Sequence, residues 1–246
     1  MKKLGLIGHP VGHSKSPLFF KTKLALIQRP EIKYSAYDLA SIEDFENLVT
    51  TEKELVGLNV TIPHKENIIP KLCCLDEEAA AIGAVNTIVK TEKGWKGYNT
   101  DSFGFSKSLK PFIKGSHERA LVLGSGGASR AVVYSLRKLG IRTIVVSRTP
   151  SDDQVGYDEL TPEALGHYLL LVNCTPLGTH PDIDSCIDIP WEGVGEKHLA
   201  VDLVYNPEET TFMKRSKSRG ASVMNGADML RIQAERSLKI WLEHGL

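Results

Sequence analysis

The sequence of 246 residues predicts an α/β protein with two domains. Short apolar runs alternate with helix-length amphipathic segments almost from the first residue, which is typical of a largely parallel sheet with crossover helices. A polar connection that carries Gly and Pro, Lys110–His117, then interrupts this alternation and has the composition of a domain boundary. A second alternation of apolar runs and helical segments follows it. We therefore expect two α/β domains, each with its own sheet.

The first half predicts strands and helices in turn. Helices are expected at Pro17–Ile27 and Ile42–Leu48, where apolar residues recur with a helical period. Strands are expected at Lys3–Gly8, Lys33–Leu39, Val56–Ile62 and Ala84–Val89. The last of these and Trp95–Asn99, joined through Glu92-Lys-Gly94, have the pattern of a hairpin added to the parallel sheet.

The second half predicts four more strands and a long terminal helix. The strands are expected at Arg119–Leu123, Arg142–Ser147, Tyr168–Asn173 and Leu199–Tyr205. The run Gly226–Trp241 is amphipathic, with one stripe of apolar side chains and Gln233 on another face.

Composition favours a small-molecule partner. Thirty basic residues balance thirty acidic ones, so the chain lacks the positive charge of proteins that bind nucleic acids or anionic membranes. Its four cysteines have neither the density of a disulfide scaffold nor the spacing of a zinc site, and no metal is expected. The N-terminus lacks the apolar core of a signal peptide, and we expect a cytoplasmic protein.

A glycine-rich loop follows the first strand of the second half. In ALVLGSGGASRA, Gly124, Gly126 and Gly127 lie between an apolar strand and a helical run. Glycine lets the backbone turn sharply next to a diphosphate, and the helix N-terminus offers N–H groups and a positive dipole end. Ser129 occupies the third position of the G-x-G-x-x-G pattern, which indicates a variant of this fingerprint. The loop predicts a Rossmann-like dinucleotide-binding domain.

The next strand indicates which dinucleotide binds. A domain that binds NAD usually has an acidic residue at the end of this strand, where it holds the ribose hydroxyls. Here the strand ends on Ser147, Arg148 and Thr149. An arginine pairs with a 2′-phosphate, which a carboxylate would repel. NADP is therefore the predicted cofactor, although Arg148 taken alone is also compatible with a solvated charge.

Polar side chains follow the strands of the first half. Ser14 and Ser16 in HSKSP follow the first strand, and either one is also suited to cap the helix that begins there. Thr61 and Lys65 follow the third strand. Because parallel strands direct their carboxyl ends to one edge of the sheet, we expect these groups to collect there. Hydroxyl, amide and charged groups suit a small polyhydroxy acid.

The stretch GLNVTIPHK leaves two explanations for Lys65 open. In the first explanation, the lysine follows a buried strand merely to keep that strand soluble. In the second explanation, the lysine delivers an ammonium group to a reacting oxygen. The remainder of the sequence favours the second explanation.

A series of motifs in chain order resembles the shikimate dehydrogenase family. They are HSKSP, NVTIPHK, GAVNT, YNTD, GSGGASRA, SRT, NCTPLG, DLVYNP and GADMLRIQA, and they extend over essentially the whole chain. The resemblance implies a reversible, NADP-dependent reduction of 3-dehydroshikimate to shikimate in aromatic amino acid biosynthesis. It also implies that the active site lies in a cleft between a substrate domain and a Rossmann-like NADP-binding domain.

The resemblance assigns domains and residues. The substrate domain would comprise residues 1–105 and 223–246, and the cofactor domain residues 106–222. Lys65 would be the catalytic residue and Asp101 its partner. The substrate-binding residues would be Ser14, Ser16, Thr61, Lys65, Asn86, Asp101, Tyr205 and Gln233. The cofactor-binding residues would be Gly124, Ser125, Gly126, Gly127, Ala128, Ser147, Arg148, Thr149, Leu203 and Gly226. The protein would bind NADP(H) and shikimate as a monomer or homodimer, without nucleic acid or membrane partners.

Two departures and two alternatives accompany this interpretation. Many relatives that use NADP carry a second arginine where this chain has Pro150-Ser-Asp-Asp153, so phosphate binding would depend on Arg148. Ser16, often threonine in relatives that use quinate, favours shikimate.

A sensor that binds the same ligands without turnover is a second hypothesis, which an NADPH absorbance assay tests. A nucleotide-binding module without a substrate site is a third, which thermal shift with shikimate tests.

Overall fold

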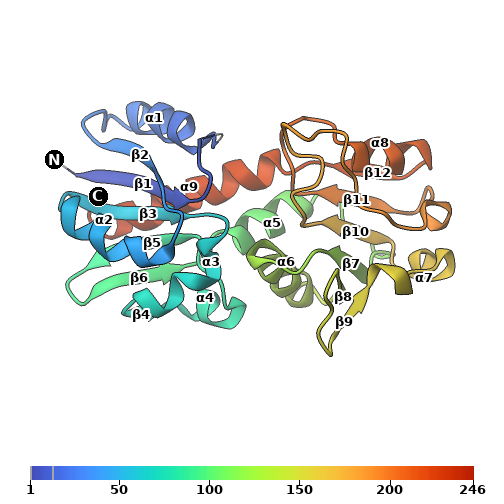
Figure 1. Cartoon of the computed structure of the whole chain (residues 1–246). Coiled ribbons are helices and arrows are strands. Elements are labelled where there is room, and N and C mark those ends of the chain that lie inside the picture. The colour runs from blue at the N-terminus through green and yellow to red at the C-terminus, as the bar shows by residue number, and fades with distance from the viewer. Residues whose placement is uncertain (1, 13) are drawn as a thin grey trace. The chain divides into compact units, whose positions relative to one another are not determined.

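The chain forms two six-stranded sheets in a computed structural model that describes residues 2–12 and 14–246 (Figure 1). It divides into two compact units, one formed by Met1–Thr100 with Gln233–Leu246 and the other formed by Asp101–Ile232. Among the described residues, no helix has the length and apolar character needed to cross a membrane.

The first unit has a mixed sheet with the strand order β2-β1-β3-β5-β6-β4. Parallel pairs join β1 to β2, β1 to β3 and β4 to β6, and antiparallel pairs join β3 to β5 and β5 to β6. Its elements are β1 (Lys3–Gly8), α1 (Ser16–Leu26), β2 (Lys33–Asp38), the 3-10 turn η1 (Ile42–Asp44), α2 (Phe45–Thr51), β3 (Leu55–Val60), α3 (His64–Asn67), η2 (Ile69–Lys71), β4 (Cys74–Leu75), α4 (Glu77–Ile82), β5 (Thr87–Thr91), β6 (Gly94–Tyr98) and the C-terminal part of α9 (Ala227–Glu243).

Apolar side chains cover both faces of this first sheet. One face packs against α1 and α9 in a cluster that contains Phe20, Leu238 and Trp241. The Trp241 indole N–H donates to the Ile88 carbonyl at 3.1 Å, which satisfies its polar atom inside the core. The opposite face packs against α2 and α4 in a cluster that contains Phe45 and Ala79. These clusters hold the sheet between two layers of helices.

Asn59 on β3 is the centre of a buried polar network in this unit. Its Oδ1 accepts a hydrogen bond from the Tyr34 hydroxyl at 2.8 Å. Its Nδ2 group lies 3.2 Å from Thr87 Oγ1 and 3.1 Å from Ser237 Oγ, and it also contacts the Asn86 carbonyl. A buried amide is tolerated only where its donors and acceptors find partners. The network therefore fixes the register of β2, β3, β5 and α9 at one level of the core.

The second unit has an entirely parallel sheet with the strand order β12-β11-β10-β7-β8-β9. This order, which runs outward from β7 in both directions, is that of a doubly wound dinucleotide-binding fold. Its elements are α5 (Asp101–Leu109), β7 (Arg119–Leu123), α6 (Gly127–Lys138), β8 (Arg142–Ser147), β9 (Gln154–Gly156), η3 (Tyr157–Glu159), α7 (Pro162–His167), β10 (Leu170–Asn173), η4 (Trp191–Gly193), β11 (Leu199–Asp202), α8 (Thr211–Ser218), β12 (Ser222–Met224) and the first turns of α9.

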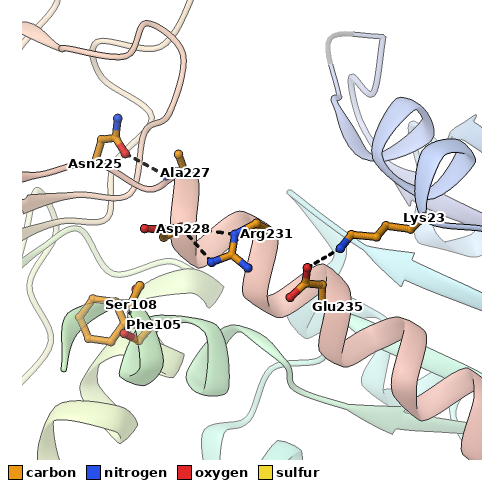
Figure 2. A network of polar contacts seen from close by, with 8 residues as sticks. All are labelled: Lys23, Phe105, Ser108, Asn225, Ala227, Asp228, Arg231 and Glu235. Atoms are coloured by element: carbon orange, nitrogen blue, oxygen red, sulfur yellow. Dashed lines mark hydrogen bonds and ion pairs between the residues drawn. The ribbon is translucent and has the colours of Figure 1, made fainter. Parts of the chain in front are cut away.

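The start of α9 is fixed by local polar contacts, which Figure 2 shows. Asn225 Oδ1 accepts a hydrogen bond from the Ala227 N–H at 3.1 Å and so satisfies a donor in the first turn. One turn later Arg231 pairs with Asp228 at 3.0 Å. Farther along, Glu235 pairs with Lys23 of α1 at 2.6 Å, which ties the first unit's part of α9 to α1. The helix is thus anchored at its start by a cap and on its surface by ion pairs.

The structure confirms the predicted α/β class and corrects several boundaries. Lys3–Gly8, Arg119–Leu123 and Arg142–Ser147 are strands with the predicted limits. The strand expected at Ala84–Val89 begins only at Thr87, although the Asn86 N–H still donates to the Tyr98 carbonyl and the Asn86 carbonyl still accepts from the Val60 N–H. The segment predicted as one helix from Ile42 to Leu48 is a 3-10 turn followed by α2. The short strands β4, β9 and β12 were not predicted.

We expect Asn59→Ala to lower the unfolding free energy of the protein by about 2–4 kcal/mol, because it leaves several buried polar groups without a partner. Asn47→Ala, at an exposed position of α2 in the same unit, is the matched control and should change it by less than about 0.5 kcal/mol. Urea denaturation followed by circular dichroism measures both. Equal effects of the two substitutions would contradict the role given to the network.

Candidate functional site

The segment between β1 and α1 carries the two predicted serines. Ser14 and Ser16 are both partly exposed, and the Ser14 hydroxyl accepts a hydrogen bond from the Ser16 N–H at 3.2 Å. Pro17 occupies the first turn of α1, where a missing N–H costs nothing. Ser14 thus satisfies the backbone at the helix start, and Ser16 begins the helix. His13 of the same motif lies outside the described residues.

The segment after β3 carries Thr61 and Lys65. Thr61 donates its N–H to Ile7 of β1 at 2.9 Å, and its carbonyl accepts the His64 N–H at 2.9 Å. Lys65 lies in α3, and its carbonyl accepts the Val85 N–H at 2.7 Å. The buried His64 ring anchors this short helix through a contact of 2.6 Å between Nε2 and the Leu39 carbonyl. Hydrogen bonds from the backbone and from the His64 side chain therefore hold the short helix that carries Lys65 in place.

Asn86 and Gln233 meet in the first unit. Asn86 Nδ2 donates to Gln233 Oε1 at 3.3 Å and to Thr100 Oγ1 at 2.9 Å. Asn86 Oδ1 accepts the Thr100 N–H at 2.7 Å, while Thr100 Oγ1 donates to Gln233 Oε1 at 3.2 Å. Gln233 Oε1 accepts both of these hydrogen bonds. The Gln233 amide is therefore oriented with Oε1 toward Asn86 and Thr100 and with Nε2 pointing away from them. These contacts continue the Asn59 network through Ser237, which lies 3.1 Å from Thr100 Oγ1.

Sheet register places these groups at one edge of the first unit. The carboxyl ends of β1 and β3 lie side by side because the two strands are parallel. The antiparallel β5 begins at this same edge, where the Val60 N–H donates to the Asn86 carbonyl at 2.9 Å. Strand direction alone predicted that Thr61 and Lys65 lie at this edge, whereas Asn86 was assigned by the family resemblance. Asp101 is buried and opens α5, the first helix of the second unit.

The glycine loop has the geometry that its sequence predicts. Gly124 has φ of 107°, a conformation that disfavours any residue with a Cβ. Gly126 precedes α6, no described side chain caps this helix, and a Cβ added at Gly126 would meet nothing within 4 Å. Ser129 is buried and donates its hydroxyl to the Gly126 carbonyl at 2.6 Å. The serine that replaces the third glycine therefore closes the loop with an extra hydrogen bond.

The end of β8 lies beside this loop. The Ser125 and Ser147 hydroxyls are 3.1 Å apart, so the predicted diphosphate loop and adenosine segment are in contact. Ser147 is buried, and its hydroxyl accepts the Thr149 N–H at 3.3 Å. Arg148 and Thr149 are exposed. Arg148 directly follows β8 and so lies at the carboxyl edge of the sheet.

Gly226 has a packing reason to be glycine. A Cβ at this position would lie 2.0 Å from the Leu203 carbonyl oxygen, so the close approach of the two backbones excludes any larger residue. The Gly226 N–H donates to the Val204 carbonyl at 3.1 Å. Tyr205 is partly buried, and burial raises the pKa of its hydroxyl, which stays protonated as a donor near neutrality.

A second buried polar network, which the sequence did not predict, supports this edge of the second unit. Asp202 at the end of β11 accepts hydrogen bonds from Thr210 Oγ1 at 2.5 Å, Asn173 Nδ2 at 2.9 Å and the Val204 N–H at 3.0 Å. Asn173 Oδ1 in turn accepts the Thr175 N–H at 2.8 Å. The signal was present in NCTPLG and DLVYNP as polar residues at strand ends. Their partners depend on tertiary structure.

The described residues contain no group of three or more His, Cys, Asp or Glu side chains with the spacing of a metal site. The donors and acceptors described at these two sheet edges include hydroxyls, amides, the Lys65 ammonium, the Arg148 guanidinium, the Asp202 carboxylate and backbone N–H groups. Such groups bind a polyhydroxy acid and a phosphorylated nucleotide by hydrogen bonds and ion pairs.

Comparison with known proteins gives one consistent family. Residues 6–88 match the family described as the shikimate dehydrogenase substrate binding domain. The shikimate dehydrogenase (NADP(+)) of Shouchella clausii (strain KSM-K16) is 38% identical, over 98% of this chain and 92% of that protein. The same enzyme of Crocosphaera subtropica (strain ATCC 51142 / BH68) is 38% identical, over 98% and 91%. The structure of shikimate 5-dehydrogenase from Thermus thermophilus in complex with NADP(H) and shikimate has a TM-score of 0.87 and 34% identity, over 99% and 94%.

Asp202 should make stability depend on pH in a direction opposite to that of most carboxylates. Burial raises its pKa from 3.8 to about 6, so the folded state binds the proton more tightly than the unfolded state. This stabilisation is complete below the unfolded pKa and is lost as pH rises through about 6, a change of at most about 3 kcal/mol. Asp202→Asn removes it.

We therefore expect the unfolding free energy of the unsubstituted protein, relative to Asp202→Asn, to fall between pH 4 and pH 7. Denaturant unfolding at both pH values measures this difference. Asp152→Asn, at an exposed position of the same unit, is the matched control for the change from carboxylate to amide. A difference for Asp202→Asn that is constant with pH would show that this carboxylate does not titrate in the range.

Proposed function

The chain belongs to the shikimate dehydrogenase family, and from this premise we propose that it catalyses the reversible reduction of 3-dehydroshikimate to shikimate with NADPH. It is an oxidoreductase that acts on a CH–OH group. The observation that carries the assignment to this site is the fixed position of Lys65 in α3, at the sheet edge where Asn86 contacts Gln233. Each predicted site residue then has a role in this reaction.

The substrate is bound through its carboxylate and its ring hydroxyls. Ser14 and Ser16 offer hydroxyls at the start of α1, where a carboxylate is also favoured by the helix dipole. Thr61, Asn86 and Gln233 bind ring hydroxyls. The contact between Asn86 and Gln233 orients both amides before substrate arrives, so little entropy is lost in ordering them. Tyr205 lies near the substrate as a protonated donor.

The chemical step needs an acid at the carbonyl oxygen. NADPH, when bound, supplies the hydride, and the attacked carbonyl leaves growing negative charge on its oxygen. The Lys65 ammonium stabilises this charge and donates a proton, a contribution of about 10²- to 10⁴-fold in rate. In the reverse direction neutral Lys65 accepts the hydroxyl proton. Asp101, assigned by the YNTD motif, positions Lys65 and a substrate hydroxyl.

The residues of the second unit fit a bound NADP. Gly124, Ser125, Gly126, Gly127 and Ala128 form the loop and first turn whose backbone N–H groups hold the diphosphate, and the open space at Gly126 supports this role. Ser147, Arg148 and Thr149 hold the adenosine phosphate. Leu203 and Gly226 border the nicotinamide, and the contact between their backbones keeps that wall in place.

The broader assignments follow the same premise. The proposed substrate domain comprises residues 1–105 with 223–246, and the proposed cofactor domain comprises residues 106–222. These functional bounds differ from those of the compact units, which include residues 101–105 and 223–232 in the second unit. The enzyme works in the cytoplasm as a monomer or homodimer, without nucleic acid or membrane partners. The balance of thirty basic and thirty acidic residues supports the absence of a polyanionic partner.

Lys65→Ala should lower kcat for shikimate oxidation by about 10²- to 10⁴-fold while shikimate still binds, because the substitution removes the proton-transfer group and leaves the other contacts. Absorbance at the NADPH band measures turnover, and thermal shift with shikimate measures binding. Lys53→Ala, at an exposed position of the same unit, is the control and should keep full activity. Unchanged turnover in Lys65→Ala would refute the assignment, and no turnover in the unsubstituted protein would favour a sensor.

Arg148→Ala should raise KM for NADP by about 10- to 100-fold, as expected for the loss of a charge-assisted phosphate contact, and leave KM for shikimate unchanged. KM for NAD should change little, since NAD has no 2′-phosphate. Arg142→Ala, at the opposite end of β8, is the control. Steady-state oxidation of shikimate and of quinate with each cofactor gives all these constants. Equal increases in KM for NADP and NAD would mean that Arg148 does not read the phosphate.

A further inference from the structure

Two adjacent thiols lie on the surface of the first unit, apart from the residues assigned to the reaction. Cys73 and Cys74 are both exposed, and their Sγ atoms are 3.4 Å apart. Consecutive side chains of a strand point to opposite faces, which would separate two neighbouring thiols. Cys73 precedes β4, whose first residue is Cys74, and it is therefore free of that alternation. The two sulfur atoms consequently meet on the same side.

The backbone that carries these thiols is held by the hairpin of β5 and β6. The Cys73 N–H donates to the Trp95 carbonyl at 2.9 Å, and β4 pairs with β6 through Cys74 and Lys96 (Figure 1). The Cys73 side chain also packs near the hairpin turn, since a Cβ added at Gly94 would lie 3.7 Å from its Sγ. Much of the entropy cost of bringing two thiols together has therefore been met by folding.

We propose that Cys73 and Cys74 form a vicinal dithiol site for trivalent arsenicals. An arsenoxide R–As=O condenses with two thiols to form two As–S bonds, and the two S–H protons leave with the oxygen as water. The oxidation states of arsenic and sulfur do not change, so no oxidant or reductant is needed. The product is a cyclic dithioarsenite that bridges neighbouring residues.

The distance between the sulfurs selects this class of ligand. Two bonds of about 2.3 Å from sulfur to one soft atom span 3.4 Å when they meet at roughly 95°. That angle suits a pyramidal trivalent centre, whereas a metal bound linearly needs the sulfurs on opposite sides. Zinc needs about four ligands, and no set of three or more His, Cys, Asp or Glu groups suited to a metal occurs in residues 2–12 and 14–246.

Protonated thiols favour condensation over single-thiol chemistry. The hydrogen bond with Cys73 raises the pKa of the Cys74 thiol, and the nearby Lys96 lowers it only as a smaller effect. The thiolate is the reactive species in alkylation and disulfide exchange, so a raised pKa slows those reactions near neutrality. Condensation with an arsenoxide uses the thiol protons to form water.

Phenylarsine oxide is the probe that tests this site. Intact mass spectrometry should show one adduct per chain with loss of one water, and the number of thiols that react with Ellman's reagent should fall by two. An excess of 2-mercaptoethanol should leave the adduct in place, while 2,3-dimercaptopropanol should remove it. Absence of the adduct, or loss of fewer than two thiols, would overturn the proposal without any substitution.

Substitutions then locate the site. Cys73→Ser and Cys74→Ser should each weaken binding by at least about 100-fold, because one thiol loses the effective concentration of the second. The double variant Cys174→Ser/Cys186→Ser should bind like the unsubstituted protein. Circular dichroism verifies that each variant is folded. Full binding by Cys73→Ser or by Cys74→Ser would place the arsenical elsewhere. Loss of binding in Cys174→Ser/Cys186→Ser would do the same.

Discussion

The buried amide of Asn59 is the contact on which the substrate edge of the first unit depends. It joins Tyr34 of β2, Thr87 of β5 and Ser237 of α9 by hydrogen bonds of 2.8 to 3.2 Å. These residues are far apart in the sequence, and a buried amide with missing partners costs more than its hydrogen bonds contribute. Apolar packing alone permits small slips between helix and sheet. The polar network selects one register among them.

The same register bears on the proposed function, because Asn86 and Gln233 belong to the continuation of this network. Thr100 lies between them and contacts both amides as well as Ser237. In the proposed complex a substrate hydroxyl would therefore meet donors and acceptors that are already oriented. Lys65 is held by different contacts: the Val85 N–H donates to the Lys65 carbonyl, and the neighbouring His64 ring contacts the Leu39 carbonyl. The residues proposed to bind substrate and the lysine proposed to transfer the proton thus lie at one sheet edge but are held by separate contacts.

Sequence reasoning predicted the parts of this structure that depend on local pattern. Lys3–Gly8 and Arg119–Leu123 were predicted with correct limits because each is one apolar run closed by glycine. The glycine loop was predicted because strand, loop and helix are consecutive. The limits of β5 were wrong: the strand begins at Thr87 and not at Ala84. The supports of the candidate site, such as Asn59, Tyr34 and Asp202, were missed because their partners are distant in the sequence. A polar residue in an apolar run does not indicate its partner.

The two units support their ligand edges with different chemistry, and this difference suits their roles. The network around Asn59 and Asn86 contains amides and hydroxyls, which do not change charge near neutrality. In the proposed mechanism Lys65 gains and loses a proton during turnover, whereas these amides and hydroxyls keep their charge and their hydrogen bonds. In the second unit a carboxylate, Asp202, organises the strand ends, and burial raises its pKa to about 6. Its charge near neutrality strengthens the bonds from Thr210 and Asn173. The carboxyl edge of the second sheet, where the cofactor is proposed to bind, thereby combines charge-assisted hydrogen bonds with sensitivity to pH.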